Sequence, residues 1–317
     1  MQLIRGFYNI SSFTKGCALT IGNFDGVHLG HQAILHHLNQ QAKKLGLPTV
    51  VMLFEPQVKE FFLQQKAPAR LMRLRDKLRY LREQKVDYVL CIQFNQTFAN
   101  LSANSFIQDF LVKKLNVKFL SIGDDFRFGI NREGDFDTLK KAGEQFGFNV
   151  ENNTTFSFGK QRISSTAIRQ ALSRNDFRSA KLMLGREYNI SGRVVKGRQL
   201  GRTIGFPTAN IMLKREVIPL QGVYAVKIKD QKGRYYTGVA NVGNRPTVNG
   251  SKSLLEVHIF DVNKELYGQR LDVIFCFKIR DEQKFASIEA LSTQIAQDAS
   301  VARTFFESED KINVYGE

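Results

Sequence analysis

Cysteine is scarce in this sequence, which has three cysteines in 317 residues: Cys17, Cys91 and Cys276. They lie far apart, an odd number cannot all pair, and none forms the C-x-x-C spacing typical of zinc or redox sites. We therefore expect three buried thiols without a redox or zinc-binding role.

Long apolar runs are also missing. No stretch approaches the roughly 18 uninterrupted apolar residues of a membrane-spanning helix, and residues 1–15 lack the apolar core of a signal peptide. There is no internal repeat and no low-complexity linker. We expect a cytoplasmic protein that does not bind membranes, and the pattern leaves the oligomeric state open.

Acidic residues are outnumbered, 30 against 46 basic ones, which gives a net charge of +16. Nucleotides, nucleic acid or acidic lipid could each be the anionic partner. The densest basic stretch is "RLMRLRDKLRYLREQK", residues 70–85, where Leu71, Leu74, Leu78 and Leu81 recur at helical spacing. We interpret it as a helix packed by its leucines with its charges in solvent, and RNA binding through this helix is the alternative.

Two different periodicities divide the chain, and its length favours two domains. Over residues 1–185, short apolar strands alternate with helical patterns, which predicts an α/β domain with a parallel sheet. Ligands of such sheets bind beyond the carboxyl ends of the strands. Over residues 186–317, alternating strands joined by short loops predict an antiparallel β-barrel, followed by a C-terminal helix.

The stretch "GNFDGVHLGH", residues 22–31, follows an apolar strand and precedes a helix that we expect to begin at Gly30 or His31. The free N–H groups at a helix N-terminus bind phosphate, and His28 and His31 would add side-chain donors at the same place. A zinc site is the first alternative, but the stretch has too few ligands and lacks the zincin spacing. A structural role for both histidines is the second alternative.

A second polar cluster is "RISSTAIRQAL", residues 162–172. Ser164, Ser165 and Thr166 lie at an expected helix start, with Arg169 one turn inside the helix. One hydroxyl suffices to cap a helix. The residues alone do not decide between a cap and a binding cluster.

In the predicted barrel, "GFPTAN" places Thr208 and Asn210 two residues apart, so both side chains leave the same face of an extended strand. Their oxygens are ligands that suit Mg²⁺. Glu256, in "LLEVHIF", shares a strand face with His258. A single glutamate on a strand usually faces solvent, so the pattern alone does not make it catalytic.

Residues 23–31, "GDDFRFG" at 123–129 and "ISSTAIR" at 163–169 together resemble the adenylyltransferase domain of bacterial bifunctional FAD synthetases, the riboflavin kinase/FMN adenylyltransferases. The H-x-G-H pattern alone points only to the wider nucleotidylyltransferase superfamily. The resemblance implies a Rossmann-like nucleotidylyltransferase fold over residues 1–185, with ATP and FMN as substrates and FAD as product. It also implies that Mg²⁺ bridges the ATP phosphates.

By this resemblance, His28, His31 and Arg169 are the catalytic residues of adenylyl transfer. The nucleotide is expected to contact Gly22, Asn23, Phe24, Asp25, Gly30, Ser164, Ser165 and Thr166, and the flavin to contact Asp125, Phe126 and Phe128. One departure is visible: family members often have histidine and proline after "FEP", whereas this chain has Gln57 and Val58.

The later segments "GRTIGFPTAN", "NVGNRPTV", "LEVHIFD" and "IRDEQKF" resemble, in order and spacing, the riboflavin kinase domain of the same family. The resemblance implies that Glu256 is the catalytic base and that Thr208 and Asn210 hold Mg-ATP. Gly201 and Arg202 would belong to a flap over the phosphates, and Arg280 to the flavin side.

We therefore predict a bifunctional enzyme that phosphorylates riboflavin to FMN and then adenylylates FMN to FAD. Loss of one of the two activities is an alternative. Because of the departure at Gln57, the adenylyltransferase would be the activity lost. RNA binding by the basic helix is the alternative from another functional class.

Overall fold

The computed structural model describes residues 1–10, 13–123, 125–153, 157–158, 161–197, 201, 204–213, 217–247, 250–262 and 265–314. Its contacts divide the chain into two compact units. The first comprises Met1–Pro68 and Met72–Ser165, and the second Ala69–Leu71 and Thr166–Glu317. The boundary after residue 185 concerns the functional domains and stays a prediction.

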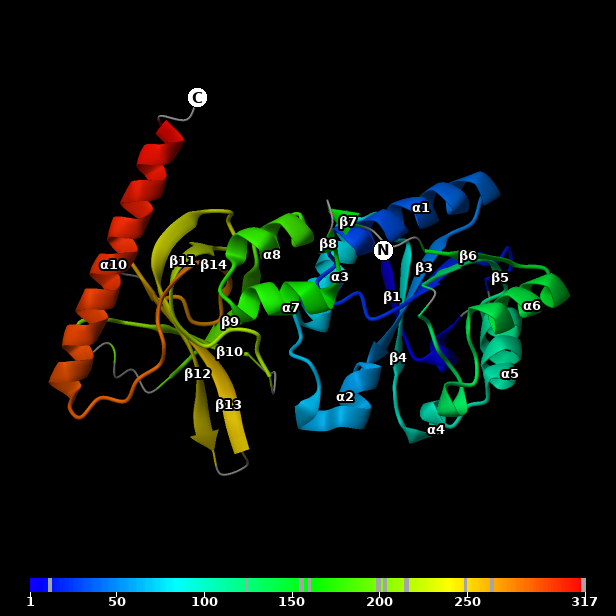
Figure 1. The fold of residues 1–317 in the computed structure, drawn as a ribbon, viewed down its shortest axis with the longest axis horizontal. Coiled ribbons are helices and arrows are strands. Elements are labelled where there is room, and N and C mark those ends of the chain that lie inside the picture. Colours follow the sequence, from blue (N-terminus) through cyan, green and yellow to red (C-terminus); the bar gives the residue numbers. More distant parts are fainter. Residues whose placement is uncertain are drawn as a thin grey trace. The chain divides into compact units, whose positions relative to one another are not determined.

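A six-stranded parallel sheet forms the centre of the first unit, in the order β1-β4-β3-β2-β5-β6 (Figure 1). This confirms the predicted parallel sheet. The strands are β1 (Gln2–Arg5), β2 (Cys17–Ile21), β3 (Thr49–Glu55), β4 (Tyr88–Gln93), β5 (Val117–Ile122) and β6 (Asn149–Asn152). All five residues of β2 are buried, as expected of a parallel strand covered on both faces.

Alternate residues of these strands enter different cores. Leu19, Met52 and Leu90 belong to one core cluster, together with Phe106 and Leu139 from helical segments. On the opposite face, strand residues such as Val51 and Val89 pack with helix residues such as Leu35 and Leu81. The sheet is therefore sandwiched between two helical layers.

The helical segments of the chain up to the barrel are α1 (Leu29–Leu45), α2 (Val58–Leu63), α3 (Leu74–Glu83), α4 (Gln96–Ala99), α5 (Ala103–Ser105), α6 (Phe136–Phe146), α7 (Ser165–Ser173) and α8 (Phe177–Leu184), with shorter turns η1 (Phe7–Asn9), η2 (Gln64–Lys66) and η4 (Ile130–Arg132) and the π-helix η3 (Phe106–Lys114). A two-stranded ribbon of β7 (Ser157–Phe158) and β8 (Gln161–Arg162) precedes α7.

The basic helix is α3, and its description from the sequence was wrong in one respect. Leu81 is buried as predicted, but Asp76 and Lys77 are also buried, with 4% and 1% of their surface exposed. Lys77 donates a hydrogen bond to the carbonyl oxygen of Asn23 at 2.5 Å, which keeps its ammonium out of solvent. Two charged side chains of this helix, Asp76 and Lys77, are therefore buried instead of facing solvent.

The second unit contains a closed six-stranded antiparallel barrel, in the order β10-β13-β12-β11-β14-β9, which confirms the predicted barrel (Figure 1). Its strands are β9 (Asn189–Val195), β10 (Ala209–Met212), β11 (Gly222–Lys229), β12 (Tyr235–Thr247), β13 (Gly250–Ile259) and β14 (Arg270–Arg280). The predicted C-terminal helix is α10 (Ile288–Val314).

The side chains of strand β14 do not alternate regularly between its two faces along the whole strand. The alternation in "RLDVIFCFKIR" predicts that Leu271, Val273, Phe275, Phe277 and Ile279 share one face. The first three are buried, but Phe277 is 43% exposed. The register with β11 shifts between Ala225 and Val226, which pair with Phe277 and Phe275. This bulge turns the later side chains to the other face. Phe277 consequently stacks on Phe305 of α10, with ring centroids 5.3 Å apart.

All three cysteines are free thiols, and two of them are buried as predicted. Cys17 is fully buried, and this burial raises the pKa of its thiol to about 12. Cys276 is only partly buried, which corrects the prediction for that residue. Cys276 follows Phe275 of the buried face, so it lies on the opposite face of β14, where it packs in part against a cluster that includes Ala302 and Phe306.

We expect the thiol reagent DTNB to label Cys276 at pH 8 in the folded protein and to leave Cys17 unlabelled until the protein is unfolded. The thiolate is the reactive form, and the raised pKa keeps Cys17 protonated at that pH. Mass spectrometry of the labelled peptides measures this order. Equal labelling rates for Cys17 and Cys276 in the folded protein would contradict it.

Candidate functional sites

The connection between β2 and α1 is a strained turn. β2 ends at Ile21 and α1 begins at Leu29, one residue before the first of the two helix starts that the sequence predicted. Phe24 and Val27 have φ angles of 46° and 39°, and both side chains are buried. Such angles are rare for bulky and β-branched residues, and strain of this kind is found at functional sites.

Hydrogen bonds from distant parts of the sequence hold this turn. The backbone N–H of Met72 donates to Asp25 Oδ1 at 3.3 Å, and the Ser165 hydroxyl donates to the Asp25 carbonyl oxygen at 2.8 Å. Lys77 holds the Asn23 carbonyl oxygen. Asp25 is 1% exposed, so its carboxylate holds the turn in the protein interior.

His28 is the N-cap of α1, because its Nδ1 accepts the backbone N–H of His31 at 3.3 Å. In a neutral imidazole one nitrogen accepts and the other carries the proton, so Nε2 of His28 is a donor. The two rings stack, with centroids 3.6 Å apart and an interplanar angle of 17°. A Cβ at Gly30 would lie 3.2 Å from this His28 ring. The prediction that His28 and His31 lie together is confirmed.

The polar cluster at residues 164–169 begins α7, as predicted. Ser165 is the first residue of the helix, and its hydroxyl donates to the Asp25 carbonyl oxygen in the turn after β2. Thr166 and Arg169 belong to the second compact unit, where Arg169 Nε donates to the Ala69 carbonyl oxygen at 2.5 Å. The binding roles of Ser164, Thr166 and Arg169 stay predictions.

The "GDDFRFG" loop follows β5, at the same edge of the sheet as the turn after β2. Phe128 is 8% exposed and belongs to the core, in contact with Phe106. Phe126 stacks on Phe128 at 5.6 Å and is half-buried, and Asp125 is exposed. Of the two phenylalanines, Phe126 is therefore the one with surface left for a ligand.

Gln57, the departure from the family pattern, is the N-cap of α2. Its side chain accepts the backbone N–H of Glu60, and Glu60 Oε2 accepts the N–H of Gln57 at 2.9 Å. Gln57 is 6% exposed, and its Nε2 has no hydrogen-bond partner among the described residues. Gln57 thus takes part in a capping box at the start of α2. Its Nε2 amide group, just after β3 in the sequence, remains a buried donor.

A cavity of about 300 Å³ lies in the second unit, against the outer face of β10, β13 and β12. Asn210, Glu256 and Asn241 are directly opposite one another on these three neighbouring strands. His258 lines the cavity too, and its Nδ1 donates to the Pro207 carbonyl oxygen at 3.0 Å. The prediction that Glu256 and His258 share a strand face is confirmed, and both half-buried residues line the cavity.

Thr208 and Asn210 both line this cavity, as their spacing predicts. The backbone passes close to them: a Cβ at Gly197 would lie 2.5 Å from the Asn210 amide, and a Cβ at Gly201 would lie 2.3 Å from the Phe206 carbonyl oxygen. A side chain at position 201 would collide with backbone, so glycine is required there, and a side chain at position 197 would displace the Asn210 amide. Arg202, the other predicted flap residue, lies outside the described residues.

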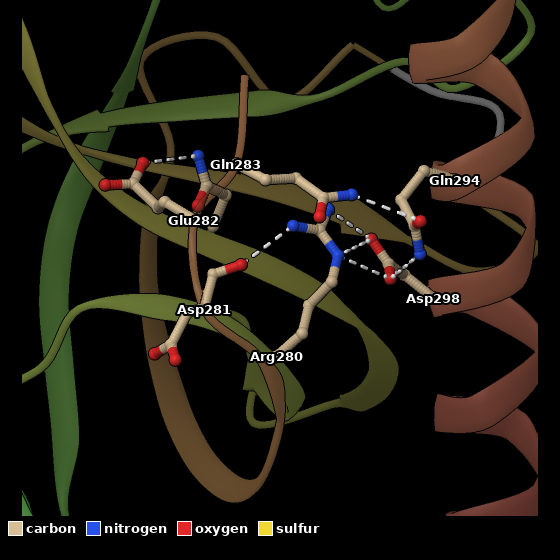
Figure 2. A network of polar contacts seen from close by, with 7 residues as sticks. Arg280, Asp281, Glu282, Gln283, Gln294 and Asp298 are labelled. Atoms are coloured by element: carbon tan, nitrogen blue, oxygen red, sulfur yellow. Dashed lines mark hydrogen bonds and ion pairs between the residues drawn. The ribbon is translucent and has the colours of Figure 1, made fainter. Parts of the chain in front are cut away.

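Arg280 lines the same cavity, and Figure 2 shows its guanidinium between the segment after β14 and helix α10. Its Nε and a terminal nitrogen donate to the two oxygens of Asp298 at 2.9 and 2.8 Å. Its other terminal nitrogen donates to the Asp281 carbonyl oxygen at 2.9 Å. Gln294 donates to Asp298 at 3.0 Å. Arg280 thus ties the cavity wall together, which the sequence did not predict.

Three polar residues that the sequence analysis missed belong to these sites. Asn241 faces the cavity next to Glu256, and its Oδ1 is buried without a hydrogen-bond partner among the described residues. Asp298 is 2% exposed and holds Arg280, and Lys77 holds the turn after β2. Asn241 lies in the quoted "NVGNRPTV" segment, which was a usable signal. Nothing in the sequence separates Lys77 from its basic neighbours.

No group of three or more His, Cys, Asp or Glu side chains in the described part of the chain is arranged to hold a metal ion. The expected magnesium ligands of the second unit are of another kind, a hydroxyl and an amide oxygen. Mg²⁺ often takes few protein ligands and is completed by water and substrate phosphates. The hydroxyl oxygen of Thr208 and the amide oxygen of Asn210 suit a magnesium site of this kind.

Two family models match the chain, one in each half. A model described as FAD synthetase matches residues 10–167, and a model described as riboflavin kinase matches residues 184–306.

Two relatives match over nearly their whole length. The bifunctional riboflavin kinase/FMN adenylyltransferase of Haemophilus influenzae is 56% identical over 308 residues, which are 97% of this chain and 100% of the relative. The bifunctional riboflavin kinase/FMN adenylyltransferase of Escherichia coli K12 is 56% identical over 307 residues, 96% and 98% of the two chains.

A solved structure from Streptococcus pneumoniae, described as a macrolide-efflux protein, has a TM-score of 0.76 and 32% identity. The match covers 95% of this chain and 98% of that protein. In the described part of the present chain, no helix has the length and apolar character needed to cross a membrane.

The ion pair of Arg280 and Asp298 generates a stability prediction. Asp298→Ala is expected to lower the free energy of unfolding by about 3 kcal/mol, because it leaves a largely buried guanidinium without its partner. Replacing both residues, as Arg280→Met with Asp298→Leu, is expected to cost less than the single change. Urea unfolding of the three variants measures these differences, and an equal or larger loss in the double variant would contradict the prediction.

Proposed function

The chain belongs to the bifunctional riboflavin kinase/FMN adenylyltransferases, and on this premise we propose that its two reactions occur at two separate sites. The enzyme phosphorylates riboflavin to FMN and transfers an adenylyl group from ATP to FMN, giving FAD. The cavity beside Glu256 is the proposed kinase site, and the turn at residues 22–28 is the proposed adenylyltransferase site.

Glu256 is the proposed base of the kinase reaction. The ribityl 5′-hydroxyl is a neutral nucleophile, so its proton must leave as its oxygen bonds to the γ-phosphorus of ATP and the bond to ADP breaks. The row of Asn210, Glu256 and Asn241 on adjacent strands supports this assignment, because it places one carboxylate between two amides on the cavity wall.

ATP and Mg²⁺ are the proposed co-substrate and cofactor at this site. Thr208 and Asn210 would hold the ion, which neutralises phosphate charge when bound. Thr208 also borders a second cavity of about 80 Å³, whose lining includes Val194, Val257 and Tyr267. The mainly apolar walls of this second cavity suit an adenine ring. We therefore assign ATP to the second cavity, next to Thr208, and riboflavin to the larger cavity.

Riboflavin would lie toward α10 in the larger cavity. Phe285, Leu291 and Ile295 provide apolar surface there, and Asn241 on the same wall has a buried Oδ1 acceptor without a partner among the described residues. Every hydrogen bond seen for Arg280 goes to Asp298 or Asp281, so its proposed contribution to flavin binding is to hold this wall in place.

Adenylyl transfer needs no base, because the phosphate of FMN is already an anion when it attacks the α-phosphorus and pyrophosphate leaves. Positioning and stabilisation of negative charge are then the main requirements. The N-terminus of α1 offers backbone N–H groups, and His28 offers its Nε2 proton beside the stacked ring of His31. These groups support a triphosphate site at Gly22, Asn23, Phe24, Asp25 and Gly30.

The remaining assignments at the first site rest on the family resemblance. Arg169, Ser164 and Thr166 would contact the nucleotide, and Asp125 and Phe126 the flavin. We propose Gln57 as a functional replacement for the histidine common in the family, since its buried Nε2 is still able to donate.

A cytoplasmic location and domains divided after residue 185 are also part of the proposal. RNA binding by α3 is less favoured, because Lys77 of that helix is directed to the protein interior.

Glu256→Gln is expected to reduce FMN formation at least about a hundredfold, because the amide cannot accept the hydroxyl proton. Conversion of supplied FMN to FAD should be unchanged. Chromatography of flavins after incubation with ATP and Mg²⁺ measures both steps. Glu289→Gln, the same chemical change at an exposed residue of α10, is the control. Loss of both steps in a folded Glu256→Gln protein would contradict separate sites.

His28→Ala is expected to reduce conversion of FMN to FAD about a hundredfold and to leave FMN formation unchanged, because one donor to the reacting phosphates is lost. The substitution also removes the N-cap of α1. His28→Ser retains a capping side chain and should show the same loss. Recovery of wild-type FAD formation in His28→Ser would show that capping was the only contribution of this histidine.

A further inference from the structure

Lys77 is a buried cation that neither reaction described above uses. It lies in α3, in the stretch whose basic side chains were expected in solvent, and it is 1% exposed. Lysine is almost never fully buried unless it is paired, since removing an ammonium from water costs several kcal/mol. A buried lysine at this place therefore needs an explanation beyond the charge of the helix.

The contact made by Lys77 supplies this explanation. Its Nζ donates to the carbonyl oxygen of Asn23 at 2.5 Å, a residue 54 positions earlier in the chain. Asn23 directly precedes Phe24, whose φ angle of 46° is unfavourable for a bulky side chain. A charge-assisted hydrogen bond to the preceding carbonyl fixes the peptide that leads into this strained conformation.

We propose that Lys77 is a positioning residue for ATP in adenylyl transfer, acting through the carbonyl of Asn23 on the turn that leads to the N-terminus of α1. This inference rests on the proposed function of the turn. The hydrogen bond sets the direction of the peptide groups that approach the triphosphate. Without it, the turn can relax toward ordinary φ angles and the N–H groups lose their alignment with the phosphates.

The test uses the full-length enzyme with FMN and ATP, so that the kinase step is bypassed. Lys77→Met keeps most of the side-chain length and removes the donor. We expect kcat/KM for ATP to fall about tenfold or more, mainly through KM, and the inhibition constant of pyrophosphate to rise in parallel. The KM for FMN should stay near the wild-type value. Arg82→Met removes the same charge from an exposed position of α3 and should behave as wild type.

A purely structural role gives a different result. Partial unfolding lowers the apparent kcat, because fewer molecules are active, and leaves both KM values and the pyrophosphate constant unchanged. Lys77→Gln, which keeps a shorter neutral donor, is expected to raise KM for ATP by about threefold, and it replaces the Met variant if that protein does not fold. Phosphorylation of riboflavin by the same preparations confirms that the second site is intact.

Wild-type values of KM for ATP and of the pyrophosphate constant in folded Lys77→Met, or in Lys77→Gln where the former does not fold, would overturn the inference. The variant His28→Ala separates this failure from failure of the proposed site. If His28→Ala impairs adenylyl transfer and the Lys77 variants do not, only the role of Lys77 is wrong. If neither affects it, the turn is not the adenylyltransferase site.

Discussion

The first site depends on a turn that cannot hold its own shape. Residues 22–28 include two bulky residues at positive φ, and local sequence favours other conformations there. The turn is held by hydrogen bonds from Lys77 of α3, from the backbone of Met72 two residues before that helix, and from Ser165 at the start of α7. The conformation of the turn before α1, where we propose that phosphate binds, therefore depends on residues distant in the sequence.

The second site obtains its geometry in another way. A closed barrel fixes neighbouring strands in register, and this register alone places Asn210, Glu256 and Asn241 in one row. The covering wall is added by α10 through Arg280 and Asp298. The chemistry also differs: a neutral hydroxyl needs a carboxylate base, whereas an anionic phosphate needs donors in place. One chain thus carries two phosphoryl chemistries with two kinds of residue.

Much of this arrangement could be predicted from the sequence, because it depends on local pattern. Continuous apolar strands predicted the parallel sheet, alternation predicted the barrel, and spacing placed Thr208 beside Asn210 and His28 beside His31. The failures have long-range causes. The burial of Lys77 depends on a carbonyl 54 residues away, the exposure of Phe277 on a bulge against β11, and the Arg280–Asp298 pair on where α10 packs. Periodicity contains none of this information.

The central claim, two independent sites in one chain, is tested most directly by mixing Glu256→Gln and His28→Ala proteins with riboflavin, ATP and Mg²⁺. Each variant lacks one site and keeps the other. The account predicts that neither protein alone forms appreciable FAD from riboflavin, and that the mixture forms it after a lag in which free FMN accumulates. A mixture that makes no FAD, although each variant performs its own half-reaction, would contradict the claim.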